Sequence, residues 1–286
     1  MIRIFSDSTS DLGPELIERY HVHIIPLHVI LGEKEYLDGV TTSPEEIFQW
    51  SDANKTTPKT SAAGIEEIVS HFRPVFEAGD EIIAFSISFD MSSSGQAMKL
   101  AAEELGYADK LSVIDSRELS TGIGHEIIEA SLLVDQGLSR AEIVSRIEAM
   151  IPRVSASFVV DTLTFLHRGG RCSGVAALAG SLLKLHPEIL VTEGRMIPGK
   201  KYRGKLMTAV QEYVKSREEE LLRAKRDRIF ITTSTHCDEE EQWTLQYLQG
   251  LNHFKQIFIT HASGVISSHC GPGTLGILYV REENEV

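Results

Sequence analysis

Three consecutive serines stand where an apolar run gives way to a helix-forming sequence. Residues 82–87 are almost all apolar, Ser92, Ser93 and Ser94 follow, and residues 97–105 favour a helix. A serine at a helix start accepts a hydrogen bond from a free backbone N–H group, and the other free N–H groups and the helix dipole attract anions. The segment is therefore either an ordinary helix cap or a binding site for a carboxylate or phosphate.

A second hydroxyl pair, Thr60 and Ser61, precedes the helix predicted over residues 65–77. Either residue is a candidate helix cap, and two hydroxyl-bearing helix starts would bind an anion more strongly if the fold brought them together. A third polar segment, residues 6–11, follows the strand predicted over residues 2–5. Its side chains predict turn and capping contacts to nearby backbone, with Asp7 bracing a neighbouring loop.

Two further segments combine glycine with a charged or titratable side chain. Arg171 follows two glycines whose backbone can approach a ligand closely, and it either pairs with an acid or forms a salt bridge between domains. His269 precedes a Gly-Pro-Gly turn that would hold the imidazole in one place. Cys270 beside it is a candidate thiol nucleophile, although nothing in the sequence predicts a lowered pKa.

Alternating strand and helix patterns separate these segments. Ser43, followed by proline and three residues later by Glu46, predicts a helix that begins with a capping box. Short apolar runs alternating with helices predict crossover connections and a mostly parallel sheet, with ligands at the carboxyl ends of the strands. A helix that begins at Ser139 should end at Pro152. We therefore predict two α/β domains, residues 1–154 and 155–286.

The predicted second domain has its own series of elements. Its strands are expected at residues 156–160, 188–191, 228–232, 256–260 and 276–280, and its helices at residues 205–224 and 238–249. The small apolar residues 175–183 fit either a tunnel lining or an ordinary core.

Composition excludes several classes of function. The 286 residues carry a net charge of −13, which argues against nucleic acid as a partner, because phosphate backbones need a basic face. The three cysteines are far apart and form no CxxC pair, which excludes a disulfide framework and a zinc site. No sequence feature calls for a metal or a cofactor. The N-terminus lacks the pattern of a signal peptide and no apolar run is long enough to span a membrane, so we interpret the protein as cytoplasmic.

Together these segments resemble the DegV family, whose members include the fatty-acid-binding subunits of bacterial fatty acid kinase. The resemblance runs through nearly the whole chain and rests on the order of six motifs, at residues 7–12, 60–61, 88–97, 113–117, 166–171 and 269–276. It implies two α/β domains with a long-chain fatty acid buried between them. In the family, the carboxylate is held by residues that correspond to Thr60, Ser92 and His269, and Arg171 lies at the head-group end, in contact with the kinase or the phosphate.

The chain departs from the family pattern at two places. Ser93 stands where the family usually has glycine; its N–H can still donate to the carboxylate, but its side chain should narrow the site. Residues 62–64 replace a stretch that is usually rich in serine or glutamine. Acyl chain length and unsaturation preference are left open by the sequence.

The leading hypothesis is a protein that binds a fatty acid and presents its carboxylate to a separate kinase, a step that would serve phospholipid synthesis and allow transient membrane contact. It assigns no catalytic residue to this chain. The alternative is a stand-alone phosphotransferase or hydrolase that uses His269 with Ser92 or Cys270. The chain has neither a Gly-x-x-x-x-Gly-Lys-Ser/Thr loop nor a Gly-x-Ser-x-Gly elbow, which disfavours the enzyme. A third hypothesis, a transcription regulator, is disfavoured by the acidic charge.

Overall fold

The computed structural model describes residues 1–172 and 185–282. Its first half is built on a parallel four-stranded sheet with the strand order β2-β1-β6-β7, which confirms the parallel sheet predicted from the alternating pattern. The strands of this sheet are β1 (Ile2–Asp7), β2 (Val22–Ile25), β6 (Glu81–Ser86) and β7 (Leu111–Asp115).

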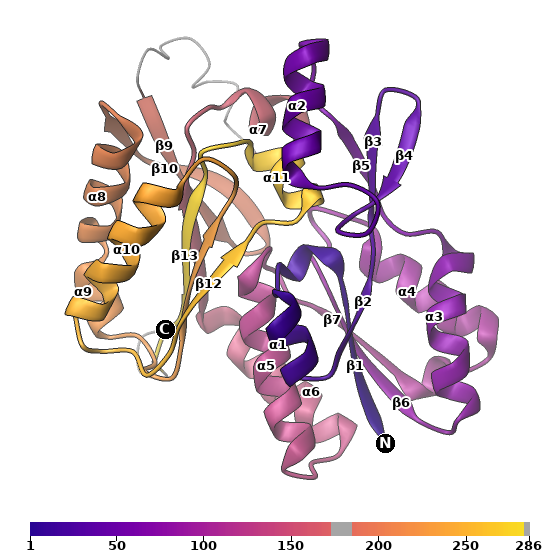
Figure 1. Ribbon diagram of the computed structural model, residues 1–286. Helices are drawn as coiled ribbons and strands as arrows, with labels where there is room; N and C mark the ends of the chain where they lie inside the picture. The colour runs from indigo at the N-terminus through magenta and orange to yellow at the C-terminus, as the bar shows by residue number, and fades with distance from the viewer. Residues whose placement is uncertain (173–184, 283–286) are drawn as a thin grey trace.

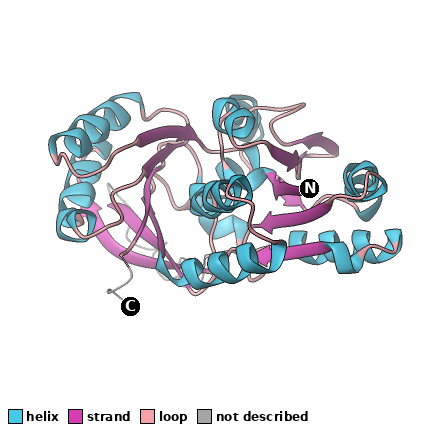
Figure 2. Cartoon of the chain, turned by 90° about the horizontal axis from the view of Figure 1, so that it is seen from below, coloured by secondary structure: helices cyan, strands magenta, loops and turns pink. Residues whose placement is uncertain are grey.

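Helices accompany this sheet, as Figures 1 and 2 show. They are α1 (Pro14–Arg19), α3 (Ile65–Glu77), α4 (Ser94–Leu105), α5 (Thr121–Asp135) and α6 (Arg140–Met150). The capping box predicted at Ser43 is present at the start of α2 (Pro44–Asn54), and Ser139 caps α6 in the same way. Serine hydroxyls therefore fix two of these boundaries as the sequence indicates.

A small antiparallel sheet, with the order β4-β3-β5, lies beside α2. It consists of β3 (His28–Leu31), β4 (Lys34–Leu37) and β5 (Lys59–Ser61). The strand β5 corrects the expectation that Thr60 or Ser61 caps a helix, because α3 begins after Gly64, whose N–H donates to Glu67 of the first turn. Thr60 is thus presented from a strand.

The second half is built on a six-stranded sheet with the order β10-β9-β8-β13-β11-β12, in which only β11 and β12 pair in parallel. Its strands are β8 (Val154–Val159), β9 (Leu185–Thr192), β10 (Arg195–Arg203), β11 (Ile229–Thr233), β12 (Ile257–His261) and β13 (Leu275–Val280). The basic stretch around β10 is therefore a sheet edge.

The helices of the second half are α7 (Thr164–Gly169), α8 (Leu206–Ser216), α9 (Glu218–Leu222), α10 (Asp238–Gly250) and α11 (Gly264–Cys270). The single helix predicted over residues 205–224 is interrupted at Arg217, whose guanidinium turns to pair with the buried Glu188. Arg171 follows the short helix α7, and His269 lies within the short helix α11. The predicted tunnel lining at residues 175–183 lies outside the described residues.

One apolar core joins the two halves. Ile123 and Ile127 of α5 are fully buried, and they belong to the same cluster as Ile83 of the parallel sheet and Phe158 and Leu278 of the second sheet. Helix α5 accordingly contacts β1 on one side and β8 and β13 on the other. The strand β8 begins at Val154, and the domain boundary after that residue stays a prediction.

Candidate functional site

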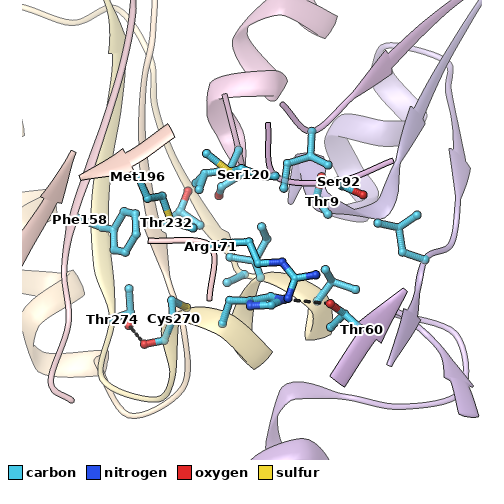
Figure 3. Close-up of a pocket in the computed structure, with 18 of the residues that line it drawn as sticks. Thr9, Thr60, Ser92, Ser120, Phe158, Arg171, Met196, Thr232, Cys270 and Thr274 are labelled. Atoms are coloured by element: carbon cyan, nitrogen blue, oxygen red, sulfur yellow. Dashed lines mark hydrogen bonds between the residues drawn. The ribbon is translucent and has the colours of Figure 1, made fainter. Parts of the chain in front are cut away.

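A cavity of about 260 Å³ lies between the two halves (Figure 3). Its apolar wall consists of Leu27, Ile87, Met91, Leu119, Phe158, Leu166, Met196, Val265, Ile266 and Leu278. Its polar wall includes all the residues of the expected carboxylate site. A largely apolar pocket with a few polar groups at defined positions is typical of a small-molecule site.

Thr60 and His269, which are 209 residues apart in the sequence, meet in this cavity. The Oγ1 of Thr60 on β5 lies 2.9 Å from Nε2 of His269 at the end of α11, as the dashed line in Figure 3 shows. This contact joins the small sheet of the first half to a helix from the second half. The fold therefore brings together two of the residues expected to hold a carboxylate.

The His269 imidazole is neutral at physiological pH. Burial, helped by the positive charge of Arg171, lowers its pKa to about 4. Its Nδ1 is buried and has no hydrogen-bond partner among the described residues. That side of the ring packs against Gly169, where a Cβ atom would lie 2.4 Å from Nδ1, so any larger residue at position 169 would displace the ring.

Ser92 and Ser93 also line the cavity, at the start of α4. Ser92 Oγ accepts a hydrogen bond from the Ser94 N–H at 3.2 Å, whereas Ser93, the N-cap residue of α4, makes no side-chain capping bond. The hydroxyl hydrogens of Ser92 and Ser93 and the Ser93 N–H meet no acceptor among the residues that the structure describes. Ser93 has φ −86°, an ordinary value, so glycine is not required there, and its side chain is exposed.

Four other hydroxyl-bearing residues on the cavity wall are hydrogen-bonded to the protein. The Oγ of Ser120 donates to Asp11 at 2.6 Å, and that of Ser234 donates to the Gly271 carbonyl at 2.8 Å. Thr274 donates to the backbone of the same turn, and Thr232 shares hydrogen bonds with two other threonines. We call these four residues the inner wall: Ser120, Thr232, Ser234 and Thr274. Nothing in the sequence distinguishes them from other hydroxyl residues, because residue type does not reveal where a hydroxyl hydrogen points.

The Arg171 side chain lines the cavity between the two halves (Figure 3). Its side chain is exposed and Nη1 donates to the Gly169 carbonyl at 2.7 Å. No ion pair joins it to another described residue, so neither of the two alternatives, a pair with an acid or a salt bridge between domains, is found among these residues. The other N–H groups of the guanidinium donate to no described residue and are available to a ligand or partner at the cavity.

The geometry does not assemble the expected nucleophile pair. Among the described residues, the His269 side chain hydrogen-bonds to Thr60 and to neither Ser92 nor Cys270. Burial raises the pKa of the Cys270 thiol to about 12, so it is not a thiolate near neutral pH. The described part of the chain has no cluster of three or more His, Cys, Asp or Glu side chains suited to a metal ion.

Comparisons with known proteins agree with the motifs. The family model for uncharacterised proteins of the DegV family matches residues 1–282. A DegV domain-containing protein of Deinococcus radiodurans is 31% identical over 278 residues, which cover 96% of this chain and 97% of that one. The chain belongs to the DegV family. The resemblance seen in the sequence is thereby confirmed.

Solved DegV structures share the whole fold. A fatty-acid-binding DegV protein from Thermus thermophilus has 30% identity and a TM-score of 0.89 over 98% of this chain and 99% of that one. A stearic-acid-binding protein from Eubacterium ventriosum has 26% identity and a TM-score of 0.84, with both chains covered completely. Within the described residues, this DegV protein has no helix long and apolar enough to cross a membrane.

Proposed function

We propose that this DegV protein binds a long-chain fatty acid in the cavity, with its carboxylate held by a head cluster made of Thr60, Ser92, Ser93 and His269. The observation that carries the proposal is the distribution of free hydrogens. The head cluster offers hydroxyl hydrogens with no protein acceptor, whereas the inner wall donates its hydrogens to the protein. A carboxylate has only acceptor oxygens, so it fits the head cluster, and an acyl chain leaves no polar group of the inner wall unsatisfied.

The His269 tautomer strengthens this assignment. A hydrogen on Nδ1 would be a buried donor without an acceptor, which is costly, so we assign the hydrogen to Nε2. The Nε2–H then donates to Thr60 Oγ1, and the Thr60 hydroxyl is left to donate its own hydrogen to the ligand. The neutral imidazole thus acts by orienting Thr60, and Arg171 supplies the positive charge at this end of the cavity.

The bound fatty acids of related proteins support the same ligand class. The direct test is to denature the purified protein, extract it with organic solvent and identify fatty acid by mass spectrometry. We expect about one fatty acid per chain, as for one pocket with one polar anchor. Lipid-free protein from several expression hosts that also fails to bind added oleate or palmitate would refute the proposal.

We further propose that the protein presents the carboxylate to a separate fatty acid kinase. The exposed Arg171 suits a phosphate or an acidic surface of the partner, because its planar fork donates two parallel hydrogen bonds. Purified alone with ATP and oleate, the protein should form no acyl phosphate, and with a cognate kinase it should. Arg171→Ala should reduce acyl-phosphate formation while oleate binding persists; synthesis by the protein alone would instead support the stand-alone enzyme.

A further inference from the structure

Helix α11 carries His269 at its end, but it packs among elements of the first half of the chain. Besides α7 of its own half, it contacts α2, β3, β5 and the 3-10 turn Ser8–Ser10, and Figure 1 shows it reaching from the second sheet toward them. Since Thr60 lies on β5, the placement of α11 decides whether His269 and Thr60 are within hydrogen-bond distance.

Two buried carboxylates from the first half hold the beginning of this helix. Asp11 Oδ1 accepts the Ser263 N–H at 2.8 Å, and Asp38 Oδ1 accepts the next one, from Gly264, at 2.6 Å. Asp11 and Asp38 are only 5% and 2% exposed. Negative charge at a helix start interacts favourably with the free N–H groups and the dipole, and the interaction is stronger when it is buried.

The second oxygen of each carboxylate is also engaged. Asp38 Oδ2 accepts from Ser8 at 2.6 Å, and Asp11 Oδ2 accepts from Ser120 at the same distance. Ser120 lines the cavity and has φ 54° and ψ −144°, a strained backbone for a residue with a side chain. The contacts thus connect the start of α11, the cavity wall and the end of β4 in the small sheet.

This arrangement is costly for a purely structural contact. No lysine or arginine of the described residues pairs with either carboxylate, and burial, with Asp38 nearby, raises the pKa of Asp11 to about 7. The Cys270 thiol, on α11 itself, also interacts with Asp11. The approach is also close: a Cβ at Gly264 would lie 2.8 Å from Asp38 Oδ1 and from Ile47. Two facing acids buried without a cation would not be favoured by stability alone.

We propose that Asp11 and Asp38 are positioning residues, which fix α11 so that His269 orients Thr60 toward the ligand. The proposal rests on the proposed fatty-acid site, and it adds two residues that touch no ligand. Their influence on binding passes through His269.

The test uses Asp38→Asn and Asp11→Asn in the full chain, with two readouts. The first is the ¹⁵N resonance of His269 Nε2, which reports the bond to Thr60 with or without ligand. The second is oleate affinity, which should fall about tenfold in each variant. Asp80→Asn is the control, because Asp80 pairs with Arg3 at the start of β6, away from the cavity. That control should keep the resonance and the affinity of the wild type.

A double-mutant cycle separates positioning from general destabilisation. In a His269→Ala background, Asp38→Asn should change oleate affinity by less than about twofold, because the residue through which it acts is gone. Full additivity of the two losses, or an unchanged His269 resonance in Asp38→Asn, would overturn the inference. If Asp38→Asn does not fold, Ser8→Ala, which removes one bond to Asp38, is measured in the same cycle.

The two proposals fail differently. A wild type that binds no oleate refutes the fatty-acid site, and the His269 resonances of the variants still decide the positioning role. A wild type that binds oleate, with Asp11→Asn and Asp38→Asn indistinguishable from it in both readouts, refutes the positioning role alone.

Discussion

The head cluster and the inner wall line the same cavity and are both rich in hydroxyls, but their hydrogens go to different places. Ser92 and Ser93 donate to no described residue, whereas the inner-wall residues Ser120 and Ser234 donate to a carboxylate and a carbonyl of the protein. A hydroxyl that already donates its hydrogen to the protein needs no further acceptor, so an acyl chain can lie against it. The difference shows that the number of polar residues in a pocket does not locate a carboxylate; the available donors do.

The largest expected effect on ligand affinity is that of Thr60→Val, which keeps the shape and removes the hydroxyl. Oleate binding should weaken by about 1 to 3 kcal/mol, because a hydrogen bond to a charged group is lost. Isothermal titration calorimetry measures the change. Unaltered affinity would mean that the head cluster is not the carboxylate site.

Ser92→Ala should have a smaller effect, about 1 kcal/mol, since one of several donors to the carboxylate is removed. The same calorimetry and a thermal melt distinguish the two roles of this residue. A clear fall in melting temperature with normal oleate affinity would show that Ser92 is a helix cap and nothing more, in keeping with the bond from the Ser94 N–H.

The neutral state of His269 predicts a pH dependence of stability. Its pKa is about 4 in the folded protein and near 6.5 when unfolded, so between these values the unfolded state binds a proton that the folded state excludes. The wild type should therefore lose stability relative to His269→Gln as the pH falls from about 6.5 toward 4, whereas the opposite contribution of Asp11, whose pKa burial raises to about 7, is the same in both proteins. Buried His125, with a pKa of about 3, is common to both proteins.

Urea denaturation at several pH values across that window measures this difference. Parallel curves for the wild type and His269→Gln would contradict the neutral, buried imidazole, and with it the assignment of the hydrogen to Nε2.

The smallest effect on affinity is expected for Thr232→Val, the inner-wall counterpart of Thr60→Val. Thr232 hydrogen-bonds to the hydroxyls of Thr121 and Thr260. Loss of the Thr232 hydroxyl should therefore lower the free energy of unfolding by about 1 kcal/mol and leave oleate affinity unchanged. Chemical denaturation and calorimetry test the two parts. A loss of affinity equal to that of Thr60→Val would remove the distinction between the two regions.

The sequence predicted those helices and strands that have strong local patterns. The capping box at Ser43, the helix start at Ser139 and the apolar strands of the parallel sheet lie where their patterns indicate. The elements it missed have weak patterns: β5 has three residues, α11 is short and rich in serine, and β10 contains proline, glycine and four cations. Such segments become strands or helices because of the neighbours against which they pack.

The candidate site depended on just those segments. Thr60 and His269 lie on β5 and α11, and their meeting is a long-range contact that residue types alone do not predict. The family resemblance suggested the pair, but of the two residues that hold α11, Asp11 was predicted only as part of a turn and Asp38 was not singled out. Only the fold shows that both carboxylates are buried and accept hydrogen bonds from the start of α11.

The most direct measurement of the central claim is ¹³C NMR of oleate labelled at its carboxyl carbon and bound to the protein. The account predicts a single bound carboxyl signal that shifts in Thr60→Val and Ser92→Ala and stays in place in Thr232→Val. A bound signal that responds to Thr232→Val and not to the head-cluster variants would contradict it, because the carboxylate would then lie against the inner wall.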